Sequence, residues 1–155
     1  MIKVLDISDQ ETARQVLRIQ IPAYEVEAKL IQFDEIPSLL DTEESLAESG
    51  ETFLGFFFDG NMQGVLSYCK ENDYWLICRL VVHPSHFNRG IATELLQFFL
   101  KEVREVSDTG IVKVSTGTAN LPAIALYKKF GFAERNTKEV APGILVTQLI
   151  KAREV

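Results

Sequence analysis

The hydrophobic positions of this chain follow two different periods. In some segments apolar residues recur at every second position or in unbroken runs, which is typical of strands, and in others they recur three or four positions apart, which is typical of helices. We expect strands at 2–7, 53–59, 63–70, 74–82, 111–116, 132–139 and 144–150. We expect helices at 8–20, 24–32, 42–46, 90–106 and 120–130, with Pro22 separating the first two.

The order of these elements predicts an α+β domain. Residues 74–82 are almost wholly apolar and are interrupted only by Arg79, which indicates a central strand. A helix connects Val82 to Ile111, so the two strands at its ends should be parallel neighbours, whereas the short turns elsewhere favour antiparallel pairs. We therefore expect a mixed, mostly antiparallel sheet with helices on both faces, formed by residues 1–155 as a single domain.

Charge and composition narrow the classes of partner. The chain of 155 residues has a formal net charge of -6 and no basic run longer than Lys128-Lys129, so a broad nucleic-acid-binding surface is not expected. An acidic chain suits a cationic partner such as an amine. There is neither a bilayer-length apolar run nor the apolar core of a signal peptide, so we expect a cytoplasmic protein without membrane attachment. Cys69 and Cys78 are expected to be reduced, with a disulfide or metal site as the alternative.

The loop before the helix at 90–106 has the chemistry of an anion site. An apolar strand stops before Pro84, and the helix then opens with Arg89-Gly90-Ile91-Ala92 and carries no carboxylate before Glu94. The N-terminal end of a helix has a positive dipole and unpaired N–H groups, so such an end can bind a phosphate or pyrophosphate. An ordinary connection between a strand and a helix is the alternative.

A second motif lies in the helix expected at 120–130. Asn120 and Tyr127 are seven residues apart, which places them about 10 Å apart along one helical face. A slender, amide-bearing ligand lying along that face could contact both side chains. Alternatively, Asn120 caps the helix and Tyr127 packs in the core.

Together the two motifs resemble those of the GNAT superfamily of N-acyltransferases. The coenzyme A-facing signature of that family is similar to Asn120-x-x-Ala123-x-x-Leu126-Tyr127-x-Lys129-x-Gly131-Phe132. Its pyrophosphate loop is similar to Arg89-Gly90-x-Ala92, which here follows Val82-x-Pro84. The order of the motifs and the elements between them also agree. The resemblance covers residues 53–132 well, the N-terminal helices loosely and the last two strands by position only.

The resemblance implies that acetyl-coenzyme A is the cofactor and that its pantetheine arm enters between two splayed parallel strands. A bulge near Leu80-Val81 would leave an N–H group free to polarise the thioester carbonyl. Asn120 would bind the pantetheine amides, and Tyr127 would be the general acid that protonates the departing thiolate. The implied cofactor-binding residues are Leu80, Val81, Val82, Phe87, Asn88, Arg89, Gly90, Ile91, Ala92, Thr93, Asn120, Ala123, Tyr127 and Lys129.

Two regions, the pyrophosphate loop and the central strand, depart from the family pattern. Phe87 and Asn88 stand where the loop usually has Gln or Arg followed by glycine. Asn tolerates positive φ, so the N–H groups of the loop can still converge on an anion. Leu76 stands on the central strand where many members carry a glutamate base, so no base is identified.

The region that forms the acceptor site in this family corresponds to residues 20–40. Its candidate substrate-binding residues are Tyr24, Glu27, Phe33 and Asp34. Glu27, Asp34 and Glu35 are its acidic groups, with a solvated surface role as the alternative. His83 and His86 border the pyrophosphate loop, and His83 is expected to be a structural hydrogen-bonding residue. No metal site is expected.

The sequence thus favours an N-acetyltransferase that moves an acetyl group from acetyl-coenzyme A to a primary amine of a small molecule or peptide by direct attack. A non-catalytic acyl-coenzyme A-binding or regulatory module of the same fold is the alternative, favoured by Leu76 and opposed by Tyr127. A nucleotide-binding domain is a third interpretation, but the chain lacks the glycine motifs of such domains. The edge of a C-terminal strand is compatible with a homodimer.

Overall fold

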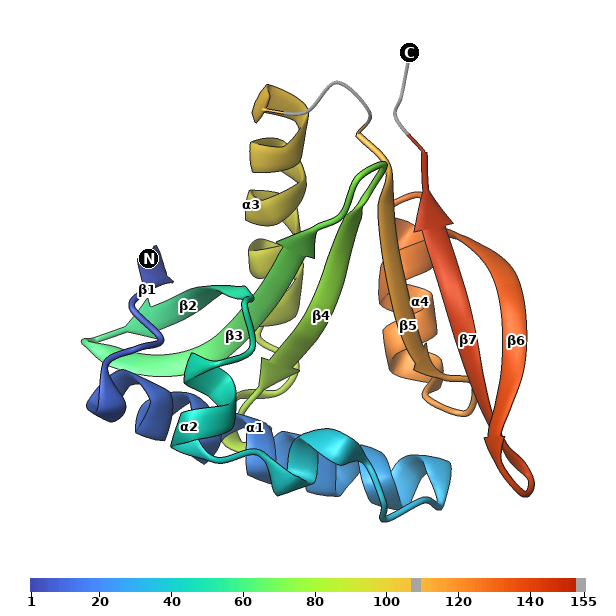
Figure 1. Ribbon diagram of the computed structural model, residues 1–155, viewed down its shortest axis with the longest axis horizontal. Coiled ribbons are helices and arrows are strands. Elements are labelled where there is room, and N and C mark those ends of the chain that lie inside the picture. The colour runs from blue at the N-terminus through green and yellow to red at the C-terminus, as the bar shows by residue number, and fades with distance from the viewer. Residues whose placement is uncertain (107–109, 153–155) are drawn as a thin grey trace.

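The computed structural model describes residues 1–106 and 110–152. These residues form one sheet of seven strands in the order β1-β2-β3-β4-β5-β7-β6 (Figure 1). The strands are β1 (Ile2–Leu5), β2 (Thr52–Phe58), β3 (Asn61–Lys70), β4 (Trp75–Val82), β5 (Val112–Gly117), β6 (Ala133–Ala141) and β7 (Ile144–Lys151). The α-helices are α1 (Gln10–Ile31), α2 (Glu43–Ala47), α3 (Ile91–Val106) and α4 (Leu121–Lys129), and short 3-10 helices lie at Pro37–Leu40 and Pro84–His86.

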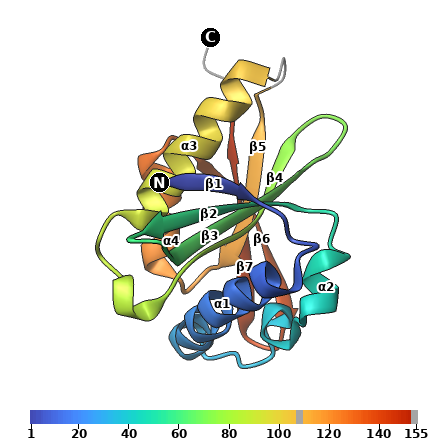
Figure 2. The same cartoon turned by 90° about the vertical axis from the view of Figure 1, so that its left-hand side faces the viewer.

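The architecture is the expected α+β arrangement. Neighbouring strands are antiparallel except for β4 and β5, which are parallel, and β4 is central as its apolar sequence predicts. Helices α1 and α2 lie on one face of the sheet, and α3 and α4 lie on the other (Figure 2). Because successive strand side chains point to opposite faces, Leu54 and Leu66 pack towards α3, whereas Phe53 and Val65 pack towards α1.

Helix α1 is continuous, so the expectation that Pro22 separates two helices is wrong. A proline inside a helix lacks an N–H donor and crowds the preceding turn, which costs about 3 kcal/mol. Packing on both sides offsets that cost, because Ala13, Val16 and Ile19 are buried before the proline and Ala28 is buried after it. The continuous helix carries its C-terminal half across the molecule to β5.

Arg79 connects the central strand to α1 and to the segment that follows α1. Its side chain is 9% exposed, and its guanidinium donates hydrogen bonds to Gln20 of α1 (3.0 Å), to Glu51 (2.9 Å) and to Asp41. Burial disfavours the charged form of Asp41 and by itself would raise its pKa. Hydrogen bonds to the carboxylate, of which the one from Arg79 has the largest effect, hold the pKa of Asp41 below the ordinary value. The residue that interrupts the apolar run is therefore the centre of a paired, buried polar cluster.

Strands β4 and β5 pair only at one end. Residues 75–77 of β4 pair with residues 112–114 of β5, and beyond this point β5 pairs only with β7 while β4 pairs only with β3. The two strands diverge below this junction (Figure 1). The splayed parallel pair expected from the resemblance is therefore confirmed.

The β-bulge in β4 lies at Cys78, not near Leu80-Val81 as expected. Consecutive residues of β3 pair with Ile77 and Arg79, which leaves Cys78 as the extra residue, while Leu80 and Val81 keep regular partners. A bulge depends on how two strands align, and β4 contains no glycine to mark it. The sequence of β4 alone therefore could not locate it.

The two cysteines are free thiols, as expected. Their Sγ atoms lie 3.6 Å apart across β3 and β4, and burial raises the pKa of both Cys69 and Cys78. Within the described residues, no group of three or more His, Cys, Asp or Glu side chains could hold a metal ion.

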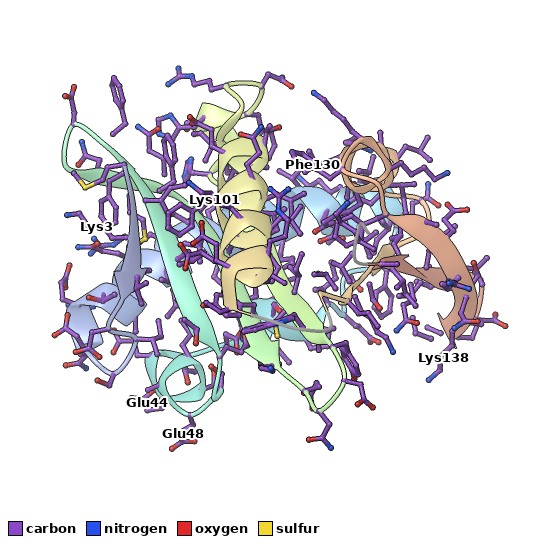
Figure 3. All side chains as sticks on the ribbon, turned by 90° about the horizontal axis from the view of Figure 1, so that it is seen from above. Lys3, Glu44, Glu48, Lys101, Phe130 and Lys138 are labelled. Carbon is purple, nitrogen blue, oxygen red and sulfur yellow. The ribbon has the colours of Figure 1, made fainter. Side chains whose placement is uncertain are left out.

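The edge strands of the sheet are more exposed to solvent than its central strands. Lys3 on β1 and Lys138 on β6 lie at opposite sides of the molecule (Figure 3). Every residue of β6 except Ala141 is exposed, and a homodimer through this edge stays a prediction. The aromatic run Phe56-Phe57-Phe58 predicts a strand buried on both faces, with an aromatic ligand site as the alternative. Phe58 at the end of β2 is 62% exposed, so this prediction is wrong for that residue. The sequence Ser107-Asp108-Thr109-Gly110 is expected to end the helix at 90–106. Its first three residues lie outside the described part of the chain.

Candidate active site

Two cavities lie along the edge of β4 that β5 leaves unpaired. One of about 430 Å³ reaches the start of α3 at Gly90 and Ile91, and we call it the α3 cavity. The other, of about 440 Å³, reaches Ile36 after α1 and Ile144 of β7, and we call it the hairpin cavity. Both are lined by Tyr24, Glu27, Leu80, Asn120, Ala123 and Tyr127. The two cavities therefore meet at a junction between α1, β4 and α4.

Backbone N–H groups dominate the far end of the α3 cavity. Asn88 and Gly90 have φ angles of 63° and 76°, left-handed conformations that Asn and Gly adopt more easily than other residues. Glu94 donates its N–H to the Gly90 carbonyl (3.0 Å), so the three helix residues before Glu94 have no partner within the helix. No Lys or Arg in the described part of the chain lines this cavity, so a bound anion would be held by the main chain and the helix dipole.

Side chains around this loop stabilise its shape. The Nδ1 atom of His83 accepts a hydrogen bond from the N–H of Ser85 (3.1 Å), which is the structural role expected for His83. The guanidinium of Arg89 lies 3.1 Å from Nδ1 of His86. Arg89 does not line the α3 cavity, whereas His86 does.

The gap exposes an unpaired edge of β4. The N–H of His83 donates to the carbonyl of Gln63 in β3 (3.0 Å). Since N–H groups alternate between the two edges of a strand, the N–H of Val81 also points to β3, and those of Leu80 and Val82 point into the gap. β5 does not pair with β4 at this level, so a ligand can form strand-like hydrogen bonds to Leu80 and Val82.

Asn120 both caps α4 and contacts α1. Its Oδ1 accepts a hydrogen bond from the N–H of Ala123 (3.3 Å), and its Nδ2 donates to Oε1 of Glu27 (3.1 Å). The side chain of Thr116 on β5 also hydrogen-bonds to Glu27. Burial raises the pKa of Glu27 even though both hydrogen bonds favour its carboxylate form. Glu27 is therefore a partly desolvated acid at the junction of the cavities.

Two phenols at this junction keep their protons. Tyr127 is 5% exposed, and its ring packs edge-on against Phe132 with centroids 5.4 Å apart. Burial, with smaller contributions from Tyr24 and Glu27, raises the pKa of Tyr127 well above its ordinary value. Burial and Glu27 raise the pKa of Tyr24 to about 12. Both hydroxyls are therefore proton donors at neutral pH.

Most of the predicted cofactor-binding residues line the α3 cavity, namely Leu80, Val81, Val82, Phe87, Asn88, Gly90, Ile91, Ala92, Thr93, Asn120, Ala123 and Tyr127. Arg89 and Lys129 do not, and Lys129 lines a separate hollow between α3 and the end of β7. Of the predicted substrate-binding residues, Tyr24 and Glu27 line both cavities, Phe33 lines the hairpin cavity and Asp34 lines neither. Leu76 also lies outside both cavities.

Sequence reasoning missed the residues that distant elements bring to these walls. Helix α1 adds Val26 and Leu30 to the α3 cavity, and β7 adds Ile144 and Val146 to the hairpin cavity. A Cβ on Gly117 would lie 2.8 Å from Ile31, so this glycine lets α1 approach β5 closely. The apolar residues after Pro22 recur at helical spacing. This spacing was the available sequence signal that α1 could form a wall of the cavities.

Comparison with protein families shows the family of this chain. The model of the acetyltransferase (GNAT) family matches residues 13–132. The chain belongs to the GNAT family. The resemblance inferred from the two motifs is thereby confirmed.

Solved GNAT structures share the fold at low sequence identity. The ribosomal-protein-S18-alanine N-acetyltransferase from Escherichia coli has a TM-score of 0.78 and 16% identity, covering 98% of this chain and 92% of that one. The PaiA N-acetyltransferase from Thermoplasma acidophilum, in complex with coenzyme A, has a TM-score of 0.77 and 16% identity, covering 99% of each chain. At these identities the likeness shows the fold alone.

A curated relative extends beyond the region of similarity. The UPF0157 protein YqkA from Bacillus subtilis (strain 168) is 39% identical over 147 residues, which represent 95% of this chain and 42% of that protein. The chain therefore spans less than half the length of that relative. Within residues 1–106 and 110–152 of the present chain, each helix is too short or too polar to cross a membrane.

Proposed function

We propose that this GNAT protein is an acetyl-coenzyme A-dependent N-acetyltransferase whose acceptor is a primary amine of a small molecule or peptide. The observation that carries the proposal is the unpaired edge of β4 at Leu80 and Val82. This edge lines the same cavity as the N–H groups at Gly90 and the phenol of Tyr127. Together these groups suit a ligand with an anionic end, an amide-bearing arm and a reactive carbonyl.

The residues of the α3 cavity fit each part of acetyl-coenzyme A. The N–H groups at the start of α3, with Asn88 and Gly90 turning the loop, suit the pyrophosphate. The open edge at Leu80 and Val82 suits the amides of the pantetheine arm, which would extend the sheet as a strand does. When bound, the thioester supplies an activated carbonyl carbon.

Two groups at the junction support acyl transfer. The N–H of Leu80 points into the gap, where it can donate to the carbonyl oxygen as negative charge develops on it. The hydroxyl of Tyr127 is protonated at neutral pH, and a departing thiolate, with a cysteine-like pKa of about 8.5, would receive that proton as the carbon–sulfur bond breaks. Burial raises the pKa of Tyr127, so the tyrosinate that forms must be reprotonated at once by the attacking nitrogen. We assign Tyr127 the role of general acid.

The hairpin cavity suits a cationic acceptor with an apolar body. Phe33, Ile36 and Val146 provide apolar walls, while Glu27 and Glu35 provide carboxylates. An amine entering from this side reaches Leu80 and Tyr127 at the junction. The acceptor and the acyl donor would therefore approach the reacting centre from opposite cavities.

Release of free thiol from acetyl-coenzyme A tests the proposal. The panel of acceptors contains polyamines, amino acids, aminoglycosides and peptides with free N-termini. We expect release that depends on an added amine. Calorimetric binding of acetyl-coenzyme A without release for any amine would instead support a non-catalytic module of the same fold.

A further inference from the structure

Glu27 is the one carboxylate among the residues that line both cavities in the described part of the chain. Its Oε1 lies 3.1 Å from Nδ2 of Asn120, and Thr116 provides a second hydrogen bond. These contacts hold the carboxylate between α1, β5 and α4. An amine that reaches the junction from the hairpin cavity must pass beside it.

No ion pair among the residues that the structure describes includes Glu27. The buried cation of this region, Arg79 on β4, is held by Asp41 and Glu51. The titratable groups that face Glu27 are phenols, Tyr24 from α1 and Tyr127 from α4, and both stay protonated. A partly desolvated carboxylate without a cation has the most to gain from a positively charged ligand.

We propose that Glu27 is the general base that removes a proton from the ammonium group of the acceptor, and that the acceptor class is therefore a primary amine that arrives protonated. This inference rests on the N-acetyltransferase function proposed above. It assigns the base to Glu27 on α1 instead of the Leu76 position on β4, which lies outside both cavities here. The ammonium group of the acceptor then supplies the positive charge that pairs with the Glu27 carboxylate.

Proton and electron transfers balance with Glu27 as base and Tyr127 as acid. Glu27 takes one proton from the ammonium group, and the nitrogen lone pair forms a bond to the thioester carbon. The carbon–sulfur bond breaks with its electron pair on sulfur, which takes the proton of Tyr127. The attacking nitrogen returns its second proton to the tyrosinate, and Glu27 releases its proton to solvent. The products are the amide, the free thiol and one proton.

Other groups are less well placed for this role. Glu35 lines only the hairpin cavity, and Asp34 lines neither cavity. His86 lines only the α3 cavity. Cys78 lines the hairpin cavity, but burial raises the pKa of its thiol, so it is not a thiolate at neutral pH.

The decisive variant is Glu27→Gln, because glutamine keeps an oxygen that can accept from Asn120 but cannot take a proton. We expect kcat/KM for the amine to fall about 100-fold or more, while the Kd of acetyl-coenzyme A by calorimetry stays within about twofold. Glu25→Gln is the matched control, because Glu25 lies two positions away on α1, is exposed and lines neither cavity. It should keep wild-type kinetics.

The pH dependence distinguishes a base from a structural support. Wild-type kcat/KM should fall at low pH as Glu27 becomes protonated, and Glu27→Asp should keep such an acid limb. Glu27→Gln would depend on amine that has already lost its proton in solution, so its pH profile should instead follow the pKa of the added amine. Across amines of similar shape and decreasing pKa, the defect of Glu27→Gln should shrink, because weakly basic amines are already neutral. A merely structural role would lower the rate equally for every amine.

The proposal is overturned if Glu27→Gln keeps the wild-type rate and acid limb. It is also overturned if the variant loses the same factor for all amines and binds acetyl-coenzyme A more weakly, since Glu27 would then only hold Asn120. If Glu27→Gln fails to fold by circular dichroism, the wild-type profile decides, and the lack of an acid limb there would overturn the proposal too. Lack of amine-dependent thiol release by the wild type overturns the proposed function itself, and the base with it.

Discussion

Oε1 of Glu27 on α1 accepts a hydrogen bond from Nδ2 of Asn120 at the start of α4, at 3.1 Å and across 93 positions of sequence. The contact joins the helix that follows the first strand to the helix that follows β5. Both residues line the two cavities, as Leu80 does. A change at Asn120 should therefore alter the ionisation of Glu27 as well as the binding of ligands.

Asn120→Asp should shift the pH dependence of activity. Aspartate still caps α4, but its carboxylate faces Oε1 of Glu27, and like charges disfavour ionisation. The pKa of Glu27, already raised by burial, should rise further, so the acid limb of kcat/KM should move to higher pH by about one unit or more. Asn72→Asp in the exposed turn between β3 and β4 is the control and should leave the limb in place. An unmoved limb in Asn120→Asp would contradict the assigned contact.

Tyr127→Phe tests the general acid. Removal of the hydroxyl should lower kcat by about tenfold to 100-fold, since proton transfer to the leaving thiolate is lost, while acetyl-coenzyme A affinity is kept. Steady-state kinetics and calorimetry measure the two effects separately. Tyr74→Phe is the control, because Tyr74 lies outside both cavities. Unchanged turnover in Tyr127→Phe would remove this residue from the acid role.

Gly90→Val tests the anion-binding loop against a matched glycine. Gly90 and Gly60 both have a φ of 76°, and a Cβ at either would meet no atom within 4 Å. Valine should therefore destabilise the protein by a similar amount at both positions, about 1–2 kcal/mol. Only Gly90→Val should abolish acetyl-coenzyme A binding by calorimetry. Equal affinity in the two variants would refute the loop assignment.

Arg79→Ala should destabilise the fold strongly. It would leave Asp41 and Glu51 partly buried without their cation, which typically costs about 3–5 kcal/mol. Because the pKa of Asp41 is lowered in the folded protein, its contribution is present above the unfolded pKa and is lost as pH falls through the folded value. Urea unfolding at pH 7 and near pH 3 should show the difference shrinking in acid. Arg104→Ala, at an exposed position of α3, should stay within about 0.5 kcal/mol of wild type.

Local signals in the sequence were sufficient to predict the strands, most of the helices and the character of the loop before α3. Strand alternation and helical spacing identified the strands and most helices, and the residue type at Asn88 anticipated its positive φ angle. The order of the two motifs identified the family. Each of these signals lies within a few consecutive residues.

Features set by distant contacts could not be predicted in the same way. The continuity of α1 through Pro22 depends on its packing against the sheet, and the bulge at Cys78 depends on the alignment of β4 with β3. The position of Glu27 depends on both α1 and the close approach at Gly117, so sequence patterns offered no reason to prefer it to Asp34. Tertiary contacts thus place Glu27 in both cavities and leave Asp34 exposed and outside them.

The short pairing between β4 and β5 has a thermodynamic consequence. With only residues 75–77 and 112–114 paired, the two strands leave a gap in the sheet that the acyl donor would fill as an eighth, non-covalent strand. Donor binding should then act as part of folding: at a donor concentration of 100 times Kd it should add about 2.7 kcal/mol to the unfolding free energy. Melting temperature should climb with donor concentration, and amide exchange at Leu80 and Val82 should slow more than at any residue of β1.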